Sequence, residues 1–148
     1  MATIANPSLS VVTVAGHPGQ RRLRVVYDVG CDPADPAAGH PVAEHIAIHA
    51  VDEHDAAVRP RPTAVLEMDD AFVVSAGTHQ RSVEGIVNRI DLDVEQDWWE
   101  ADQGGDPVPI AEWLDHVVAD IRLEFVGGAI VTATTPTVTG SWGALGQD

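Results

Sequence analysis

The chain has 148 residues, with eight basic and 23 acidic side chains and a formal net charge of −15 at pH 7. This is the length of one domain with a core of its own. The charge argues against nucleic acid and anionic membrane surfaces as partners, because phosphate groups are bound by lysine and arginine. A solubilising acidic surface is the simplest explanation of this charge, and adaptation to high salt or a cation-binding role are the alternatives.

Cysteine usage and hydropathy point to a soluble protein. Cys31 is the only cysteine, which excludes an intramolecular disulfide and a cysteine metal cluster. Residues 1–10 lack the basic and apolar regions of a signal peptide, and no stretch approaches the roughly 18 apolar residues of a membrane helix. We expect a cytoplasmic protein with a single domain over residues 1–148, frayed at residues 1–7 and 143–148.

The first predicted element is a β-hairpin. Residues 8–15 are rich in valine, and residues 21–29 alternate between apolar and polar side chains. Between them, Gly16-His17-Pro18-Gly19 has the composition of a turn. The alternation places one apolar set on the inner face of the second strand: Leu23, Val25, Tyr27 and Val29.

The middle of the chain predicts further strands. Residues 30–41 are a loop, and residues 42–51 alternate as a strand, with Ile46, Ile48 and Ala50 on one face. Residues 63–68 and 71–76 are expected to form two short strands separated by Asp69-Asp70. Residues 77–81 are a connection, and residues 82–95 are the longest alternating strand, with Ile90, Leu92 and Val94 facing inward.

The segment 106–122 fits two structures. Its apolar residues recur with a helical spacing, yet from Val117 onward they also alternate. We predict a short helical turn near residues 108–116 followed by a strand over 116–126, and keep a longer helix as the alternative. Gly127-Gly128 predicts a hairpin turn. The last strand then runs to Gly140 with a bend at Pro136.

Together these elements predict an all-β fold. Seven to nine short strands are separated by turn residues at regular spacing, and strands do not alternate with helices. This pattern favours an antiparallel β-sandwich, immunoglobulin-like or jelly-roll-like. The longer helix over 106–122 would instead give an α+β fold.

The stretch from residue 86 to 113 holds the best candidate for a functional surface. It contains three of the four tryptophans, among closely spaced acids. Neighbouring tryptophans on an extended chain point to opposite faces, so one of them is expected to be exposed or docked under its own loop. Exposed tryptophans beside acids anchor protein interfaces and hold flat or cationic ligands. The candidate binding residues are Asp97, Trp98, Trp99, Glu100, Asp102 and Trp113.

Other motifs give weaker indications of chemistry. Asp91, Asp93, Glu95 and Asp97 would share one face of a strand and could begin a Ca²⁺ site, but their spacing matches no EF-hand. His45 and His49 lie on one strand face, about 13 Å apart at four residues' rise, too far to share one metal. Cys31 lies beside acids that raise a thiol pKa. We therefore expect no catalytic residue, metal or cofactor.

The resulting hypothesis is a non-catalytic binding or assembly module that uses the acidic, tryptophan-rich loop. A protein partner or self-association into a homo-oligomer is expected, because sandwiches leave edge strands. The uncharged segment 129–135 is a candidate for such an edge. A small ligand at the tryptophan loop is possible. The alternative is a small carboxylate-based hydrolase, in which acids such as Asp97, Glu100 or Asp102 act beside a tryptophan platform.

Overall fold

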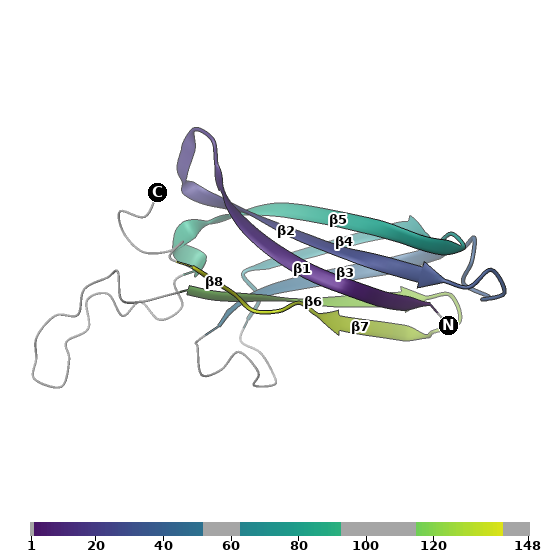
Figure 1. Ribbon diagram of the computed structural model, residues 1–148. Helices are drawn as coiled ribbons and strands as arrows, with labels where there is room; N and C mark the ends of the chain where they lie inside the picture. Colours follow the sequence, from purple (N-terminus) through teal and green to yellow (C-terminus); the bar gives the residue numbers. More distant parts are fainter. Residues whose placement is uncertain (1, 52–62, 93–114, 141–148) are drawn as a thin grey trace, which may run out of the picture.

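The computed structural model describes residues 2–51, 63–92 and 115–140 (Figure 1). Strands make up most of this part of the chain, and one short 3-10 helix follows the fifth strand. The elements in chain order are β1 (Thr3–Val14), β2 (His17–Cys31), β3 (Pro41–Val51), β4 (Leu66–Val73), β5 (Gly77–Asn88), the 3-10 helix η1 (Arg89–Leu92), β6 (Asp115–Phe125), β7 (Ile130–Thr134) and β8 (Val138–Gly140).

The strands form two antiparallel sheets that face each other (Figure 1). One sheet has the order β1-β2-β5, and the other has the order β4-β3-β6-β7, with β8 also paired to β6. The chain therefore changes sheet three times, between β2 and β3, between β4 and β5, and between β5 and β6. These changes are those of an immunoglobulin-like sandwich. The predicted all-β sandwich is confirmed, and the immunoglobulin-like arrangement is the one that fits.

The first hairpin is confirmed, and it is longer than the sequence indicated. Its turn is at Ala15-Gly16, where Gly16 has a φ of 77°, so residues 17–19 belong to β2. The prediction that residues 1–7 are frayed is wrong from Thr3 onward, because Thr3 pairs with Gly30 and Ile4 with Val29. Backbone pairing with β2 orders this segment despite its mixed composition.

The core lies between the sheets and consists of alternate residues of the central strands. Leu23, Val25 and Tyr27 of β2 are each 0 % exposed, as are Ile46 and Ile48 of β3. The predicted inner faces of these two strands are confirmed, because a buried face requires side chains at every second position.

Two predictions for the middle of the chain are wrong. Asp69 and Asp70 do not separate two strands but lie inside β4, paired with His45 and Glu44 of β3. The predicted connection 77–81 is the first part of β5, paired with residues 27–31 of β2. Backbone hydrogen bonds to a neighbouring strand outweigh the low strand propensity of aspartate and glycine here.

The predicted strand 82–95 ends early. It stops at Asn88, and the chain then turns through η1. Ile90, expected to face inward, is 64 % exposed, whereas Leu92 is 1 % exposed and joins the core. Asp91 lies in η1 and does not continue a strand face of acids. Residues 93–97 lie outside the described part of the chain.

The ambiguous segment resolves as a strand from Asp115. The predicted helical turn near 108–116 is wrong for Asp115 and His116, which pair with Gly140 and Thr139; residues 108–114 lie outside the described part. The turn at Gly127-Gly128 is confirmed, with φ of 94° and 91°. No helix in the described residues is long and apolar enough to cross a membrane.

Candidate functional site

One lateral side of the sandwich brings together two edge strands, β4 of one sheet and β5 of the other. Gly85 of β5 approaches Leu66 of β4 so closely that a Cβ at Gly85 would lie 2.7 Å from Leu66 Cδ2. Further along, the Arg81 guanidinium of β5 lies 4.1 Å from the centre of the Phe72 ring of β4. We call this side the β4–β5 opening.

A polar bridge crosses the core beside this opening. Glu44 of β3 is 2 % exposed although it carries a charge. Arg81 Nη2 donates to Glu44 Oε1 at 2.8 Å, and Arg81 Nε donates to Glu44 Oε2 at 3.1 Å. The Tyr27 hydroxyl also donates to Glu44 Oε2. The bridge thus joins two strands of one sheet to β3 of the other and supplies the hydrogen bonds that a buried carboxylate requires.

The surroundings of this bridge keep Tyr27 and Arg81 protonated. Burial, followed by the hydrogen bond to Glu44, raises the pKa of Tyr27 far above its ordinary value. The hydrogen bond to Glu44 is also the largest cause that raises the pKa of Arg81. Near neutral pH, Tyr27 is therefore neutral and Arg81 is charged. This arrangement suits a structural link better than general acid or base catalysis, which needs a pKa near the working pH.

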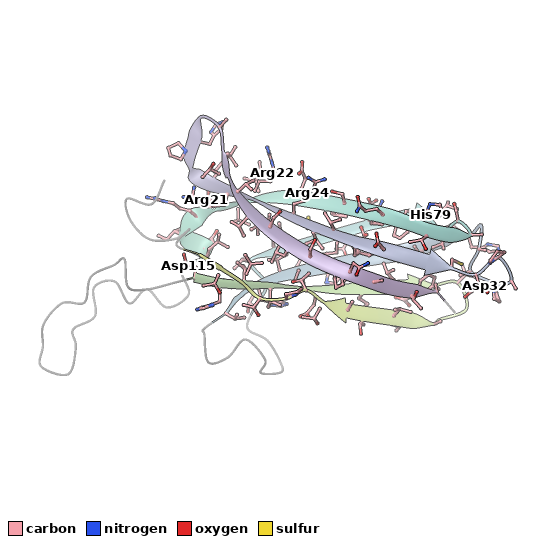
Figure 2. All side chains as sticks on the ribbon, in the orientation of Figure 1. Arg21, Arg22, Arg24, Asp32, His79 and Asp115 are labelled. Carbon is pink, nitrogen blue, oxygen red and sulfur yellow. The ribbon has the colours of Figure 1, made fainter. Side chains whose placement is uncertain are left out.

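A pocket of about 240 Å³ lies in the opening next to the bridge. Val29, Phe72 and Val74 provide apolar walls, and His79 and Arg81 of β5 provide polar groups. His79 lies toward the same end of the sandwich as Asp32 (Figure 2). Drug-sized ligands occupy pockets of about 300–1,000 Å³. This pocket is smaller, and its dimensions suit a single side chain.

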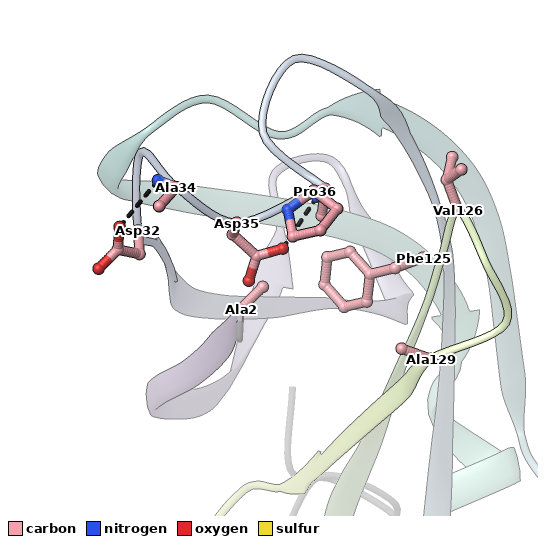
Figure 3. A pocket seen from close by; sticks show the side chains of 9 residues that line it. Ala2, Asp32, Ala34, Asp35, Pro36, Phe125, Val126 and Ala129 are labelled. Atoms are coloured by element: carbon pink, nitrogen blue, oxygen red, sulfur yellow. Dashed lines mark hydrogen bonds between the residues drawn. The ribbon is translucent and has the colours of Figure 1, made fainter.

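A larger pocket, of about 500 Å³, lies at the end of the sandwich where the start of β1, the loop between β2 and β3, and the turn between β6 and β7 meet (Figure 3). Phe125 and Pro36 line it together with Asp32 and Asp35. Both carboxylates accept loop N–H groups, Asp32 from Ala34 and Asp35 from Ala37, each at 2.8 Å. The bond from Ala37 is the first cause that lowers the pKa of Asp35. These acids hold the loop in shape, and an ionised Asp35 is poorly suited to donate a proton.

A third recess, of about 350 Å³, lies on the outer face of the sheet that contains β3, β4 and β6. His45 Nδ1 lies 2.5 Å from Asp69 Oδ1, and Arg122 Nη2 lies 4.0 Å from Glu124 Oε2. His45 is 40 % exposed and Asp69 is 76 % exposed, so water screens this pair. The described residues contain no group of three or more histidine, cysteine, aspartate or glutamate side chains placed to hold a metal ion.

The edge of β5 is long and regular. All twelve of its residues pair with β2 in one unbroken register, from Asn88 opposite Gln20 to Gly77 opposite Cys31. The strand contains no proline. Within the described part of the chain, no strand pairs with its other edge.

The other edges are interrupted or acidic. β1 has a register shift between Ala5 and Ser8, with Asn6 at a φ of 52°. β4 exposes Glu67, Asp69 and Asp70. The predicted edge at 129–135 is β7, which is separated from β8 by Pro136. Bulges, charges and prolines are the features by which proteins prevent unwanted strand pairing.

The predicted binding residues cannot be compared with this geometry. Trp98, Trp99, Trp113, Asp97, Glu100 and Asp102 all lie outside the described residues, so their role stays a prediction, as does the hydrolase alternative that depends on them. Cys31 is a free, buried thiol. Its pKa is raised as expected, but burial is the main cause and the neighbouring acids Asp35 and Asp32 contribute less. The sequence analysis missed the Glu44 bridge. The feature of the sequence that could have revealed this bridge is Glu44 itself, a glutamate at a core-facing position between Val42 and Ile46.

Comparison with known proteins gives no family. No protein-family model matches the chain, and no curated protein resembles it. The chain is weakly similar to a Bordetella pertussis protein given the name ApaA, with 11 % identity, a TM-score of 0.38, and coverage of 100 % of this chain and 96 % of that one. It is also similar to β-glucosidase 3B from Thermotoga neapolitana, with 13 % identity and a TM-score of 0.35. That match covers 95 % of this chain but 16 % of the glucosidase. Similarities this weak carry no functional argument.

Proposed function

We propose that this protein is a non-catalytic assembly or binding module that pairs one edge of β5, to which no described strand is bonded, with a strand of a protein partner. The observation that carries the proposal is the unbroken register of β5 over Gly77–Asn88. In strand addition, main-chain hydrogen bonds provide the affinity, so a long regular edge is the main requirement. The register shift in β1, the exposed acids of β4 and the break after β7 make β5 the best edge for this purpose among the described strands.

The polar groups near β5 support binding over catalysis. In the Glu44–Arg81–Tyr27 bridge, Tyr27 and Arg81 stay protonated near neutral pH. The bridge also links β5 to β3 of the second sheet. A rigid edge loses less conformational entropy when a partner strand pairs with it. The bridge therefore prepares β5 for pairing without taking part in a reaction.

A matched pair of proline variants tests this proposal. In an antiparallel ladder, the N–H and C=O of one residue point to one neighbour, and those of the next residue point the other way. Of Ser82 and Val83, one therefore directs its N–H to β2 and the other directs it to the free edge. Proline removes that N–H. We expect one of Ser82→Pro and Val83→Pro to lower the melting temperature strongly, and the other to stay folded but lose pairing.

The readouts are light scattering over a range of protein concentrations and anisotropy of a labelled peptide that alternates threonine and valine. The wild-type chain should show a concentration-dependent mass, which would be the expected homo-oligomer, or saturable peptide binding. The folded proline variant should lose both. A wild-type chain that remains a monomer at every concentration and binds no peptide would contradict the proposal, as would pairing that survives in the folded proline variant.

A further inference from the structure

The pocket in the β4–β5 opening lies where a strand added to β5 would direct its side chains. His79, Arg81 and Val83 lie on the inner side of their sheet, because they pair with Val29, Tyr27 and Val25 of the inner face of β2. Arg81 and Val83 are half-buried there, whereas His79, near the end of the sandwich, is exposed. An added strand continues the pleat of the sheet, so every second side chain of that strand also faces inward. An inward side chain opposite His79 or Arg81 would therefore point toward the pocket walls.

The pocket selects the kind of side chain. Its walls include Val29, which is 2 % exposed, and Val74, which is also 2 % exposed, together with the Phe72 ring. The Arg81 charge in the same pocket is already matched by Glu44. A volume of about 240 Å³ exceeds the roughly 30 Å³ that one water occupies and falls below that of a typical ligand site. One branched aliphatic side chain, such as leucine, fits this space and its apolar walls.

The charge around the opening selects the flanking residues. Asp70 of the neighbouring edge β4 lies on the side of the opening, opposite Glu44, and its side chain is 62 % exposed. Glu67 and Asp69 of β4, 63 % and 76 % exposed, lie beside His45 on the outer face of the same edge. Asp70 lies 3.4 Å from Arg81 Nη2, and that guanidinium also neutralises Glu44, so an excess of negative charge remains at the opening. The whole chain carries −15. Such a field attracts a basic partner and repels a second copy of the chain, most strongly at low ionic strength.

We propose that the partner strand is an extended basic segment of another protein, which pairs with β5 and inserts one aliphatic side chain into the pocket beside His79 and Arg81. This inference rests on the proposed function, because it requires that β5 accept a strand. It goes further by naming the partner's charge and its anchoring residue.

Three labelled peptides of one length test the inference by fluorescence anisotropy at low ionic strength. All alternate threonine and valine. The first carries lysines at its two ends, flanking a central inward leucine, the second replaces the lysines with glutamates, and the third replaces the leucine with serine. The first should bind most tightly, and each of the others at least about tenfold more weakly, the size expected for a buried aliphatic side chain or several charges. The preference for lysine should decline as salt is added.

Protein variants assign these preferences to the opening. Ser75→Trp places a large ring at the exposed rim of the pocket and should remove the preference for leucine over serine. Ser10→Trp, at an exposed position of β1 on the outer face of the other edge, is the matched control and should keep it. Asp70→Asn should reduce the preference for lysine over glutamate.

The outcomes separate this inference from the proposed function. If all three peptides bind equally and binding is lost in the folded proline variant, the inference is wrong and strand pairing at β5 stands. If none binds and the protein is a monomer at every concentration, both are wrong. A dimer that is lost in the folded proline variant and that the basic peptide does not dissociate would identify a second copy as the occupant of β5 and overturn the inference.

Discussion

Glu44 and Arg81 join the two sheets through a bidentate ion pair, with N–O distances of 2.8 and 3.1 Å, although the Glu44 side chain is only 1 % exposed. Removing one partner of such a pair leaves a buried charge without compensation. Glu44→Gln should therefore lower the free energy of unfolding by roughly 3–5 kcal/mol, the range found for broken buried pairs. Urea denaturation followed by tryptophan fluorescence measures this loss.

The matched control for Glu44→Gln is Glu124→Gln. Glu124 lies 4.0 Å from Arg122 and its side chain is 55 % exposed, so water screens the pair. Its loss should cost less than about 1 kcal/mol. Equal effects of the two substitutions would show that the buried bridge contributes no more to stability than a surface pair.

Tyr27 should make the fold sensitive to alkaline pH. Its folded pKa is raised by burial and by the bond to Glu44, whereas an unfolded tyrosine titrates near about 10. A raised folded pKa contributes stability that is present below the unfolded pKa and is lost as pH rises above it. Because Tyr27 is the only tyrosine, its absorbance change in alkaline titration should coincide with unfolding.

The variant Tyr27→Phe separates these effects. It removes a donor to a buried carboxylate and should cost about 1.5–3 kcal/mol at neutral pH, while it weakens the decline of stability above about pH 10. A tyrosine that titrates near its ordinary pKa while the protein stays folded would contradict this account.

Thr135 bridges the break between β7 and β8. Its N–H donates to the Ala119 carbonyl at 2.9 Å, and its hydroxyl accepts the Ala119 N–H at 3.0 Å. Next to Pro136, the threonine hydroxyl thus serves as the acceptor that a backbone carbonyl provides in a regular strand pair. Thr135 is 3 % exposed. Thr135→Val should leave the Ala119 N–H without this acceptor and cost about 1–3 kcal/mol. Thr132→Val, at an exposed position of β7, should be nearly neutral in the same denaturation measurement, and equal losses would refute the role of the hydroxyl.

The tryptophan-rich segment gives a separate prediction. If Trp98 and Trp99 anchor an interface, Trp98→Ala and Trp99→Ala should reduce assembly or partner binding with little change in melting temperature. Light scattering and thermal denaturation measure the two effects. A lower melting temperature with unchanged assembly and binding would instead show that these residues pin their loop to the core.

The sequence was most informative where side chains alternate on a buried face. Leu23, Val25 and Tyr27 were placed correctly because burial on one face imposes a period of two. It was misleading at Asp69-Asp70 and at Gly77, where turn-like residues lie inside strands. Their conformations are decided by hydrogen bonds to β3 and β2, which come from distant parts of the chain. The 3-10 helix after Asn88 ended a strand that periodicity alone would have continued.

The sequence by itself determined the strand-rich composition, the net charge of −15, the first hairpin and the alternation of the core. These properties depend on local spacing and on counts of residue types. The tertiary structure alone decided which edges remain free and which buried groups meet. Glu44 and Arg81 are 37 residues apart in sequence, and no local pattern relates them. They pair because the chain changes sheet between β2 and β3, which places β3 across the core from β5 and leaves the far edge of β5 without a neighbour among the described strands.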